Sequence, residues 1–186
     1  MAIIKTPNRL IKTRIPAPGT NKILKSLEKS ESRSMQGQLP IVWSKADGHS
    51  LFDIAGNKFI DFTSTIFVTN IGHSNKNLIK NLKRTLDKKL LHSYAYLNDN
   101  REKYLKKLVK FAGKNFEKAF LMSAGTEATE AALKLMRLYG QKAKKRKLGI
   151  ICIDGNWHGR TTGAQMMSGN KKQKERIGYE DKKIHH

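Results

Sequence analysis

The residues with the clearest chemical potential lie where a turn of small side chains enters a helix. Ser123–Thr126 form this turn, and a helical pattern with few breakers continues through Leu135. The apolar run Ala119-Phe-Leu-Met122 predicts a buried strand before it, which would extend over Phe116–Met122. The first N–H groups of a helix lack intrahelical acceptors, and the helix dipole favours negative charge there. Gly125 would let a bound group approach the backbone, and Thr126 would add a hydroxyl donor, so the turn is a candidate phosphate site.

A purely structural role for the same turn stays open. The carboxylate of Glu127 or of Glu130 could satisfy the free helix end without any ligand. Turns between a strand and a helix are common in α/β proteins, so the turn taken alone does not decide between the two roles.

A second group of chemically capable side chains follows the next predicted strand, Leu148–Ile153. Trp157 offers a flat ring that can stack on a planar ligand, and Arg160 can hold a carboxylate with two hydrogen bonds. His158 adds an imidazole. Each residue alone is usually structural or solvated. Together with the phosphate turn, however, they fit a planar phosphorylated cofactor that acts on an acid substrate.

The spacing of these elements predicts a β-α-β unit. A strand at Phe116–Met122, a helix from about Thr126 to Lys145 and a strand at Leu148–Ile153 imply parallel strands with a right-handed crossover. Because ligands bind at the carboxyl ends of parallel strands, both loops are expected on one edge of the sheet.

The N-terminal part of the chain predicts an arm, a helix and a small sheet. Residues 1 to about 20 are basic and contain proline, and we expect them to be loosely ordered until Thr20 or its neighbour caps a helix. Short apolar runs between residues 39 and 62 are separated by the turn signals Asp47-Gly48 and Gly56-Asn57. They indicate an antiparallel unit of two or three strands.

Two amphipathic helices follow this sheet. The first has Ser74 or Asn75 as its N-cap, and the second begins near Asn98 and ends at Gly113. After Met167 the sequence becomes polar, and the pattern indicates no closing strand or helix. Two parallel strands cannot complete an open sheet that is covered on both faces. We therefore expect an α/β chain that forms the front part of a larger domain.

Composition and charge bear on the remaining function classes. The 186 residues carry a formal charge of +22, but lysine is spread over nearly every segment, and no RNA-binding signature accompanies the densest basic run, 142–147. We expect no specific nucleic-acid partner. Cys152 is the only cysteine, which excludes an intrachain disulfide, and we expect no metal. Neither a bilayer-spanning segment nor a secretory signal is apparent, so we expect a cytoplasmic protein without a membrane partner.

Over residues 39–170 the sequence resembles the class III aminotransferases, the pyridoxal-phosphate enzymes of fold type I that include acetylornithine and 4-aminobutyrate aminotransferases. The most specific matching motifs are Ser123-Ala-Gly-Thr-Glu-Ala-Thr-Glu-Ala-Ala-Leu-Lys134 and Gly155-Asn-Trp-His-Gly-Arg-Thr161. They occur in order and at compatible spacing. Residues 43–62 and Asn70-Ile-Gly-His73 are similar to the family's opening segments.

The resemblance implies a domain organisation and a cofactor site. Residues 1–38 would form an arm and N-terminal helix, 39–69 the antiparallel segment of the small domain, and 70–186 the first part of the large cofactor-binding domain. The implied cofactor is pyridoxal 5′-phosphate. Its binding residues would be those of the two loops: Gly125 and Thr126 on the phosphate, Trp157 stacked on the pyridine ring, and His158 in support.

On the substrate side, the resemblance implies that Arg160 binds a carboxylate and that Phe67 lines the pocket. The implied substrates are an amino acid or amine donor and a 2-oxo acid acceptor, and the implied assembly of the full-length parent is a homodimer. One departure is small: Asn75-Lys76 stands where the family often has His-Pro.

The larger departure is an absence. The family's Schiff-base lysine, the aspartate that pairs with the pyridine nitrogen and the threonine from the neighbouring subunit have no match in these residues. Transamination needs that lysine to move a proton and that acid to keep the ring protonated. We therefore predict a transaminase as the parent, no catalytic residue in this chain, and no turnover by the chain alone. A non-catalytic cofactor-binding fragment, an aminomutase or a racemase of the same fold stay open, and a basic nucleic-acid-binding protein is the least favoured alternative.

Overall fold

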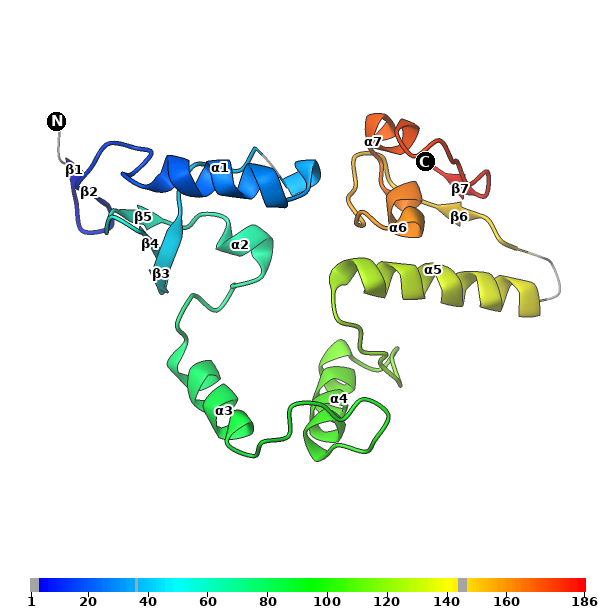
Figure 1. The fold of residues 1–186 in the computed structure, drawn as a ribbon. Coiled ribbons are helices and arrows are strands. Elements are labelled where there is room, and N and C mark those ends of the chain that lie inside the picture. The colour runs from blue at the N-terminus through cyan, green and yellow to red at the C-terminus, as the bar shows by residue number, and fades with distance from the viewer. Residues whose placement is uncertain (1–3, 36, 144–146) are drawn as a thin grey trace. The chain divides into compact units, whose positions relative to one another are not determined.

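The computed structural model describes residues 4–35, 37–143 and 147–186. Contacts between residues divide the chain into two compact units, residues 1–96 and residues 97–186, and Figure 1 labels their elements. The division at residues 69 and 70 that the family resemblance implies stays a prediction about the parent's domains.

The first unit is built on a five-stranded antiparallel sheet with the order β1-β2-β5-β4-β3. The strands are β1 (Ile4–Lys5), β2 (Leu10–Ile11), β3 (Trp43–Asp47), β4 (Ser50–Asp53) and β5 (Lys58–Ile60). Leu51 of β4 lies opposite Phe59 of β5, and the side chains of Ile11 and Leu51 are buried. The predicted antiparallel unit is confirmed as β3 to β5, and Gly48 and Gly56 adopt the positive φ that its two turns require.

The expectation of a loosely ordered arm is wrong for residues 4–13, because β1 and β2 extend the sheet. The buried Asn57 fixes the chain beyond β2: its Oδ1 accepts from the N–H groups of Lys12 at 2.6 Å and Thr13 at 3.1 Å. Its Nδ2 donates to Asp53 Oδ2 at 2.7 Å. Proline and charge in the arm predicted disorder, whereas partners some 45 residues away determine its structure.

Three helical elements complete this unit, besides the short 3-10 turn η1 (Arg33–Met35). Helix α1 (Thr20–Ser30) begins after Gly19, so Thr20 is its first residue and not its cap as predicted. The element α2 (Ser64–Phe67) is a left-handed turn, with φ between 46° and 69° at all four residues. Helix α3 (Lys76–Leu86) has the predicted Asn75 as its N-cap, whose side chain accepts from Leu78 N.

The second unit places helices around a short parallel strand pair. Its elements are α4 (Asp99–Ala112), α5 (Gly125–Lys142), β6 (Ile150–Ile151), α6 (Thr162–Met167), α7 (Lys171–Glu175) and β7 (Ile184–His185). As predicted, α4 begins near Asn98 and ends at Gly113; Asn98 is its N-cap, and its side chain accepts from Arg101 N. Figure 1 shows α6 beside both α5 and α7. The core of this unit is the buried cluster of Leu133, Ile150 and Met167.

Two expectations for this unit are wrong. Phe116–Met122 forms no strand in the described structure, so the predicted β-α-β unit is not present; Phe120, at its centre, is 70% exposed. The chain after Met167 does contain regular structure, namely α7 and β7, and β7 pairs in parallel with β6. A strand depends on a neighbouring backbone, which an apolar run by itself does not reveal. The predicted end of the long helix, Lys145, lies outside the described residues.

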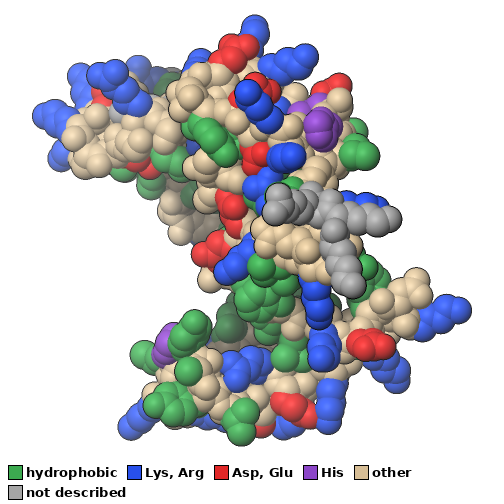
Figure 2. Space-filling view, turned by 90° about the vertical axis from the view of Figure 1, so that its right-hand side faces the viewer, with side chains coloured by type: hydrophobic (Ala, Val, Ile, Leu, Met, Phe, Trp, Pro, Cys, Tyr) green, Lys and Arg blue, Asp and Glu red, His purple; other side chains and the backbone are tan. Residues whose placement is uncertain are grey.

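The charged side chains in view in Figure 2 are spread over the surface. Figure 2 shows Lys and Arg side chains scattered over the face in view, without a single basic patch. Within the described ranges, no helix combines the length and the apolar character that crossing a bilayer requires.

Candidate functional site

The phosphate turn of the sequence prediction lies at the N-terminus of α5. Ala124 is the N-cap, in extended conformation and without a side-chain cap, and the first intrahelical bond runs from Ala128 N to Ala124 O at 3.0 Å. Among the described groups, none accepts from the N–H groups of Gly125 and Thr126. A Cβ built at Gly125 would meet no described atom within 4 Å. Backbone donors without a described acceptor, at the positive end of a helix dipole, suit an anion.

The carboxylates of Glu127 and Glu130 do not satisfy these donors. Glu127 Oε2 accepts instead from the N–H of Ser123 at 2.9 Å, which lies before the helix. Glu130 Oε1 accepts from Thr161 Oγ1 and from Ala164 N, the latter at 3.0 Å. The structural alternative considered for the turn is therefore not what this structure contains, and the first N–H groups of α5 stay available to a ligand.

The second loop lies directly against this turn. Gly159 is buried, has a φ of 132°, and approaches Thr126 so closely that a Cβ built on it would lie 2.7 Å from Thr126 Cγ2 and closer still to Oγ1. Only glycine adopts this backbone conformation readily and leaves room for the threonine. Gly125, Thr126, Trp157, His158 and Arg160 thus belong to one unit, and their two segments meet at Thr126 and Gly159, although not at the edge of the parallel sheet that the sequence predicted.

Hydrogen bonds across its base hold the loop in shape. The N–H of His158 donates to Ser168 Oγ at 2.9 Å, and Ser168, which is buried, donates in turn to Ala164 O at 3.0 Å. Gly169 N donates to Asn156 O at 3.1 Å. His158 Nε2 also lies 2.8 Å from Asn156 Nδ2, so the imidazole braces the loop from within. The supporting role of His158 toward a cofactor ring stays a prediction.

Trp157 and Arg160 lie at the exposed side of the loop. The guanidinium carbon of Arg160 is 5.8 Å from the centre of the Trp157 ring, a cation–π arrangement. The indole remains 56% exposed. A half-open aromatic ring beside a guanidinium can present one flat surface to a planar ligand and hydrogen-bond donors to an anionic group.

Phe67 belongs to the other unit, where it ends the left-handed turn α2 and is 76% exposed. Its place in the substrate pocket stays a prediction.

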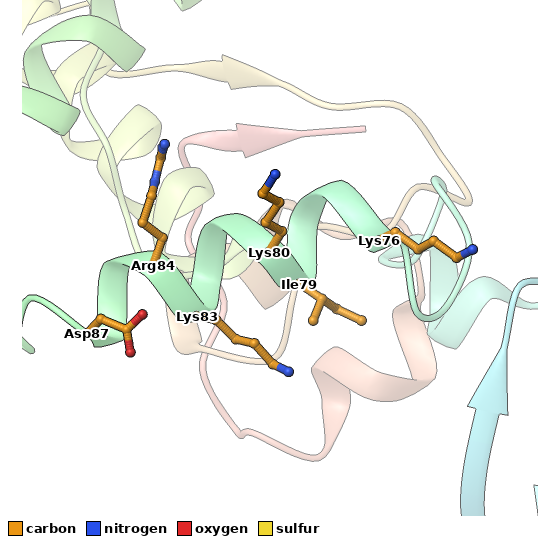
Figure 3. Close-up of a pocket in the computed structure, with 6 residues that line it drawn as sticks. All are labelled: Lys76, Ile79, Lys80, Lys83, Arg84 and Asp87. Carbon is orange, nitrogen blue, oxygen red and sulfur yellow. The ribbon is translucent and has the colours of Figure 1, made fainter.

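A hollow along α3 is not a second candidate ligand site. Lys76, Ile79, Lys80, Lys83, Arg84 and Asp87 line it. Figure 3 shows that Lys80 and Arg84 extend from one side of the helix while Ile79 and Lys83 extend from the other. These side chains do not converge on a point, so the hollow is the outer surface of one helix. In the part of the chain that the structure describes, no three His, Cys, Asp or Glu residues gather as a metal site would require.

Sequence reasoning missed the residues that hold the loop. Glu130 and Ser168 accept from backbone N–H groups, and the Asn156 side chain contacts the His158 ring. No spacing signal in the sequence distinguishes these three from ordinary polar residues. Thr161 lies at the start of a short helix, whose first N–H groups need an acceptor from outside the helix. This need was the only signal that could have pointed to a residue such as Glu130.

Comparison with known proteins connects this geometry to a family. The family model described as aminotransferase class-III matches residues 32–186, which include every element of the second unit. The chain belongs to the class III aminotransferases. It is 35% identical over 153 residues to acetylornithine aminotransferase of Clostridium acetobutylicum and 40% identical over 133 residues to ornithine aminotransferase 2 of Staphylococcus aureus.

These alignments cover 80% and 70% of the chain, but only 38% and 33% of the two relatives. This class III aminotransferase chain therefore spans well under half the length of the curated relatives it matches.

Solved structures of aminotransferases share the fold. The ornithine aminotransferase of Toxoplasma gondii aligns with a TM-score of 0.79 at 23% identity, over 94% of this chain and 40% of that one. The adenosylmethionine-8-amino-7-oxononanoate aminotransferase of Methanocaldococcus jannaschii aligns with a TM-score of 0.77 at 27% identity, over 89% and 40%. A taurine:2-oxoglutarate aminotransferase of Bifidobacterium kashiwanohense with the same fold was solved in complex with pyridoxal phosphate and glutamate.

Proposed function

We propose that the chain provides the phosphate-binding turn and the ring-stacking loop of a pyridoxal 5′-phosphate site in an aminotransferase. The observation that carries the proposal is the uncapped N-terminus of α5, with Gly125 and Thr126 held against the Trp157 loop through Gly159. The donor set fits the cofactor, because it combines free N–H groups for a phosphate with an exposed aromatic ring for a pyridine. When bound, pyridoxal phosphate supplies an electron sink for the amino carbon of the substrate.

The residues of this chain would bind and orient, and none of them would carry the proton transfer. Gly125 and Thr126 would donate backbone N–H groups to the phosphate. Trp157 would cover one face of the ring, and His158 would hold the loop through Asn156 and its own N–H. We expect no catalytic lysine in this chain, because none has the sequence setting of the family's lysine.

The substrate side extends the proposal. Arg160 would bind the carboxylate of an amino acid or of a 2-oxo acid, a role that its planar guanidinium suits. Phe67 would line the pocket. From the family resemblance we also propose a homodimer and a cytoplasmic location for the parent protein.

Ligand titration tests the phosphate seat. Trp43→Phe leaves Trp157 as the single tryptophan and thus as the reporter. We expect pyridoxine 5′-phosphate, which lacks the aldehyde that would react with surface lysines, to quench Trp157 at concentrations where pyridoxine does not. Equal quenching by both compounds, or none by either at millimolar concentration, would contradict the proposal.

Non-specific attraction needs its own control, because the chain carries a charge of +22. Gly125→Asp places a carboxylate at the proposed seat, where a side chain meets no described atom, and should abolish the phosphate preference. Gln141→Asp makes the same charge change on the last turn of α5 and should preserve it. Both titrations are run at fixed ionic strength, since screening weakens exposed charges. An equal loss in the two variants would indicate attraction by net charge alone.

The absence of a catalytic lysine has a separate test. We expect borohydride reduction of the chain with pyridoxal phosphate to give scattered low-level adducts and no transfer of amino groups. A single lysine modified at full stoichiometry, or measurable turnover, would contradict the expectation.

A further inference from the structure

Glu130 joins α5 to the segment that follows the Trp157 loop. It lies one helical turn after Thr126, so the two side chains share a face of α5. Thr126 contacts Gly159 on that face, and the Glu130 carboxylate accepts from Thr161 Oγ1 and from Ala164 N. The helix that carries the phosphate turn therefore holds the loop at two successive turns.

Helix α6 depends on this carboxylate for its N-terminus. Thr161 occupies the N-cap position but makes no side-chain cap, and the first intrahelical bond runs from Gln165 N to Thr161 O. The N–H of Ala164 donates to Glu130 Oε1 at 3.0 Å across the fold, and the N–H of Gly163 also interacts with this carboxylate. A capping acceptor normally comes from the adjacent residue in the chain; here it comes from a residue some thirty positions earlier.

The seat of the carboxylate fits closely. A Cβ built at Gly163 would lie 2.7 Å from Leu133 Cδ2 and closer still to Glu130 Oε2. Leu133 belongs to the buried core of the unit. Glycine at 163 thus lets α6 approach α5 closely enough for the hydrogen bonds to form.

The carboxylate is ionised at neutral pH. Burial raises the pKa of Glu130. The interactions with Thr161, Ala164 and Gly163 lower it by more than burial raises it, so the pKa of Glu130 lies below its ordinary value. An ionised carboxylate has two acceptor oxygens for these donors. An amide has one oxygen, and its NH2 group would face the donors of α6 as another donor.

We propose that Glu130 is a positioning residue for the loop: through Thr161 and the N-terminus of α6 it sets where Trp157 and Arg160 lie relative to Gly125 and Thr126. Loss of the carboxylate lets the loop separate from α5. The affinity for a planar phosphorylated ligand then falls, although Glu130 does not touch the ligand. This second consequence rests on the proposed function; the first does not.

The experiment separates the two consequences. The Trp43→Phe chain and its Glu130→Gln variant are compared by amide hydrogen exchange over residues 157–164, by acrylamide quenching of Trp157, and by titration with pyridoxine 5′-phosphate. We expect about tenfold faster exchange in that segment, stronger quenching and about tenfold weaker binding, since a partly buried, charged hydrogen-bond acceptor has been removed. Exchange within α4 should not change, which shows that the unit remains folded.

Matched variants keep the result specific. Glu117→Gln makes the same charge change at an exposed residue of the same unit and should behave as the parent chain. Thr161→Val removes one donor to the carboxylate and should reproduce part of the effect, and Thr161→Ser should restore it. A merely structural glutamate would show no such dependence on the Thr161 hydroxyl.

Each outcome decides the proposal. Unchanged exchange and quenching in Glu130→Gln would overturn the positioning role even if ligand binding fell. A looser loop with unchanged affinity would overturn the link to the ligand. If the parent chain does not bind pyridoxine 5′-phosphate, the proposed function fails, and exchange and quenching alone decide whether Glu130 positions the loop.

Discussion

Gly159 lies against Thr126 with no room for a side chain between them, and this contact joins the two motifs of the candidate site. One motif begins a helix and the other is a loop more than thirty residues later. Their contact joins the segment with the uncapped N-terminus of α5 to the segment that carries the exposed Trp157 ring. The relative position of the two segments, and with it the geometry of the site, therefore depends on this contact.

Gly159→Ala should therefore loosen the site. The added methyl group would overlap the Thr126 side chain, and alanine disfavours a φ of 132°. We expect a loss of about 1–3 kcal/mol of local stability, measured by amide exchange over residues 157–164. Gly155→Ala is the matched control, because Gly155 has a φ of 74° but no described atom within 4 Å of its built Cβ. An equal loss in both variants would assign the whole effect to the backbone and none to the contact.

The sequence predicted those parts of the fold that local chemistry determines. Asn75, one of the two expected caps, caps α3, and α4 begins at the expected place near Asn98, because such a capping interaction spans only three residues. The turns of the small sheet follow from the glycines at 48 and 56. In contrast, Phe116–Met122 had the composition of a strand but forms none, since pairing depends on a neighbour that composition does not encode.

The same division holds for the candidate site. The candidate roles of Gly125, Trp157 and Arg160 could be inferred from residue type and spacing. The structure adds that the two segments meet at Thr126 and Gly159 and that Arg160 lies over the Trp157 ring. Glu130 could not be assigned, because a glutamate near a helix start most simply caps its own helix. Its partners lie in a different segment, so only the packing of α5 against α6 shows what it binds.

The pair of Asp61 and His73 should make part of the first unit sensitive to acid. Asp61 Oδ2 lies 2.9 Å from His73 Nε2, while Oδ1 accepts from the N–H groups of Thr63 and Ser64. The hydrogen bond with His73 lowers the pKa of Asp61 below its ordinary value near 3.8, by more than burial raises it. A lowered pKa stabilises the folded state above that ordinary value, and the contribution is lost as the pH falls through the folded value.

We expect protection of the Thr63 and Ser64 amides from exchange, corrected for the intrinsic pH dependence, to fall below about pH 4. Asp61→Asn should lower that protection already at neutral pH, by about 1–3 kcal/mol, and remove its acid dependence. Asp99→Asn changes an exposed pair on α4 and should have little effect on unit 1. Acid-independent protection in the parent chain would contradict the assignment.

The left-handed turn α2 should be strained at Ile66. This residue has a φ of 58° and is 78% exposed, so a β-branched side chain occupies an unfavourable backbone region without gaining burial. Ile66→Gly should stabilise the turn by about 0.5–1 kcal/mol, after the entropic cost of glycine is subtracted. The measurement is amide exchange at Val68 and Thr69, whose N–H groups donate to Ser64 O. Ile71→Gly, at an exposed isoleucine without positive φ, should show no stabilisation; equal gains would refute the strain.

The ion pair of Arg137 and Asp181 should hold β7 beside β6. Arg137 Nη2 lies 2.5 Å from Asp181 Oδ2, and Asp181 also accepts from Lys183 N immediately before β7. Arg137→Met should free that segment and expose the amides of Ile150 and Cys152, which donate to Lys183 O and His185 O. Because the pair is only partly exposed, we expect a loss of about 1–3 kcal/mol of protection at those two amides.

Acid should have the same effect as this substitution. Burial raises the pKa of Asp181, but its bonds with Arg137 and with the N–H of Lys183 outweigh burial and lower it below the ordinary value of 3.8. The pair therefore contributes stability above that value and loses it as Asp181 is protonated at lower pH. Lys134→Met removes a charge from an exposed position of the same helix and should leave Ile150 and Cys152 protected. If it exposes these amides as much as Arg137→Met, the strand pair depends on the net charge of α5 and not on the ion pair.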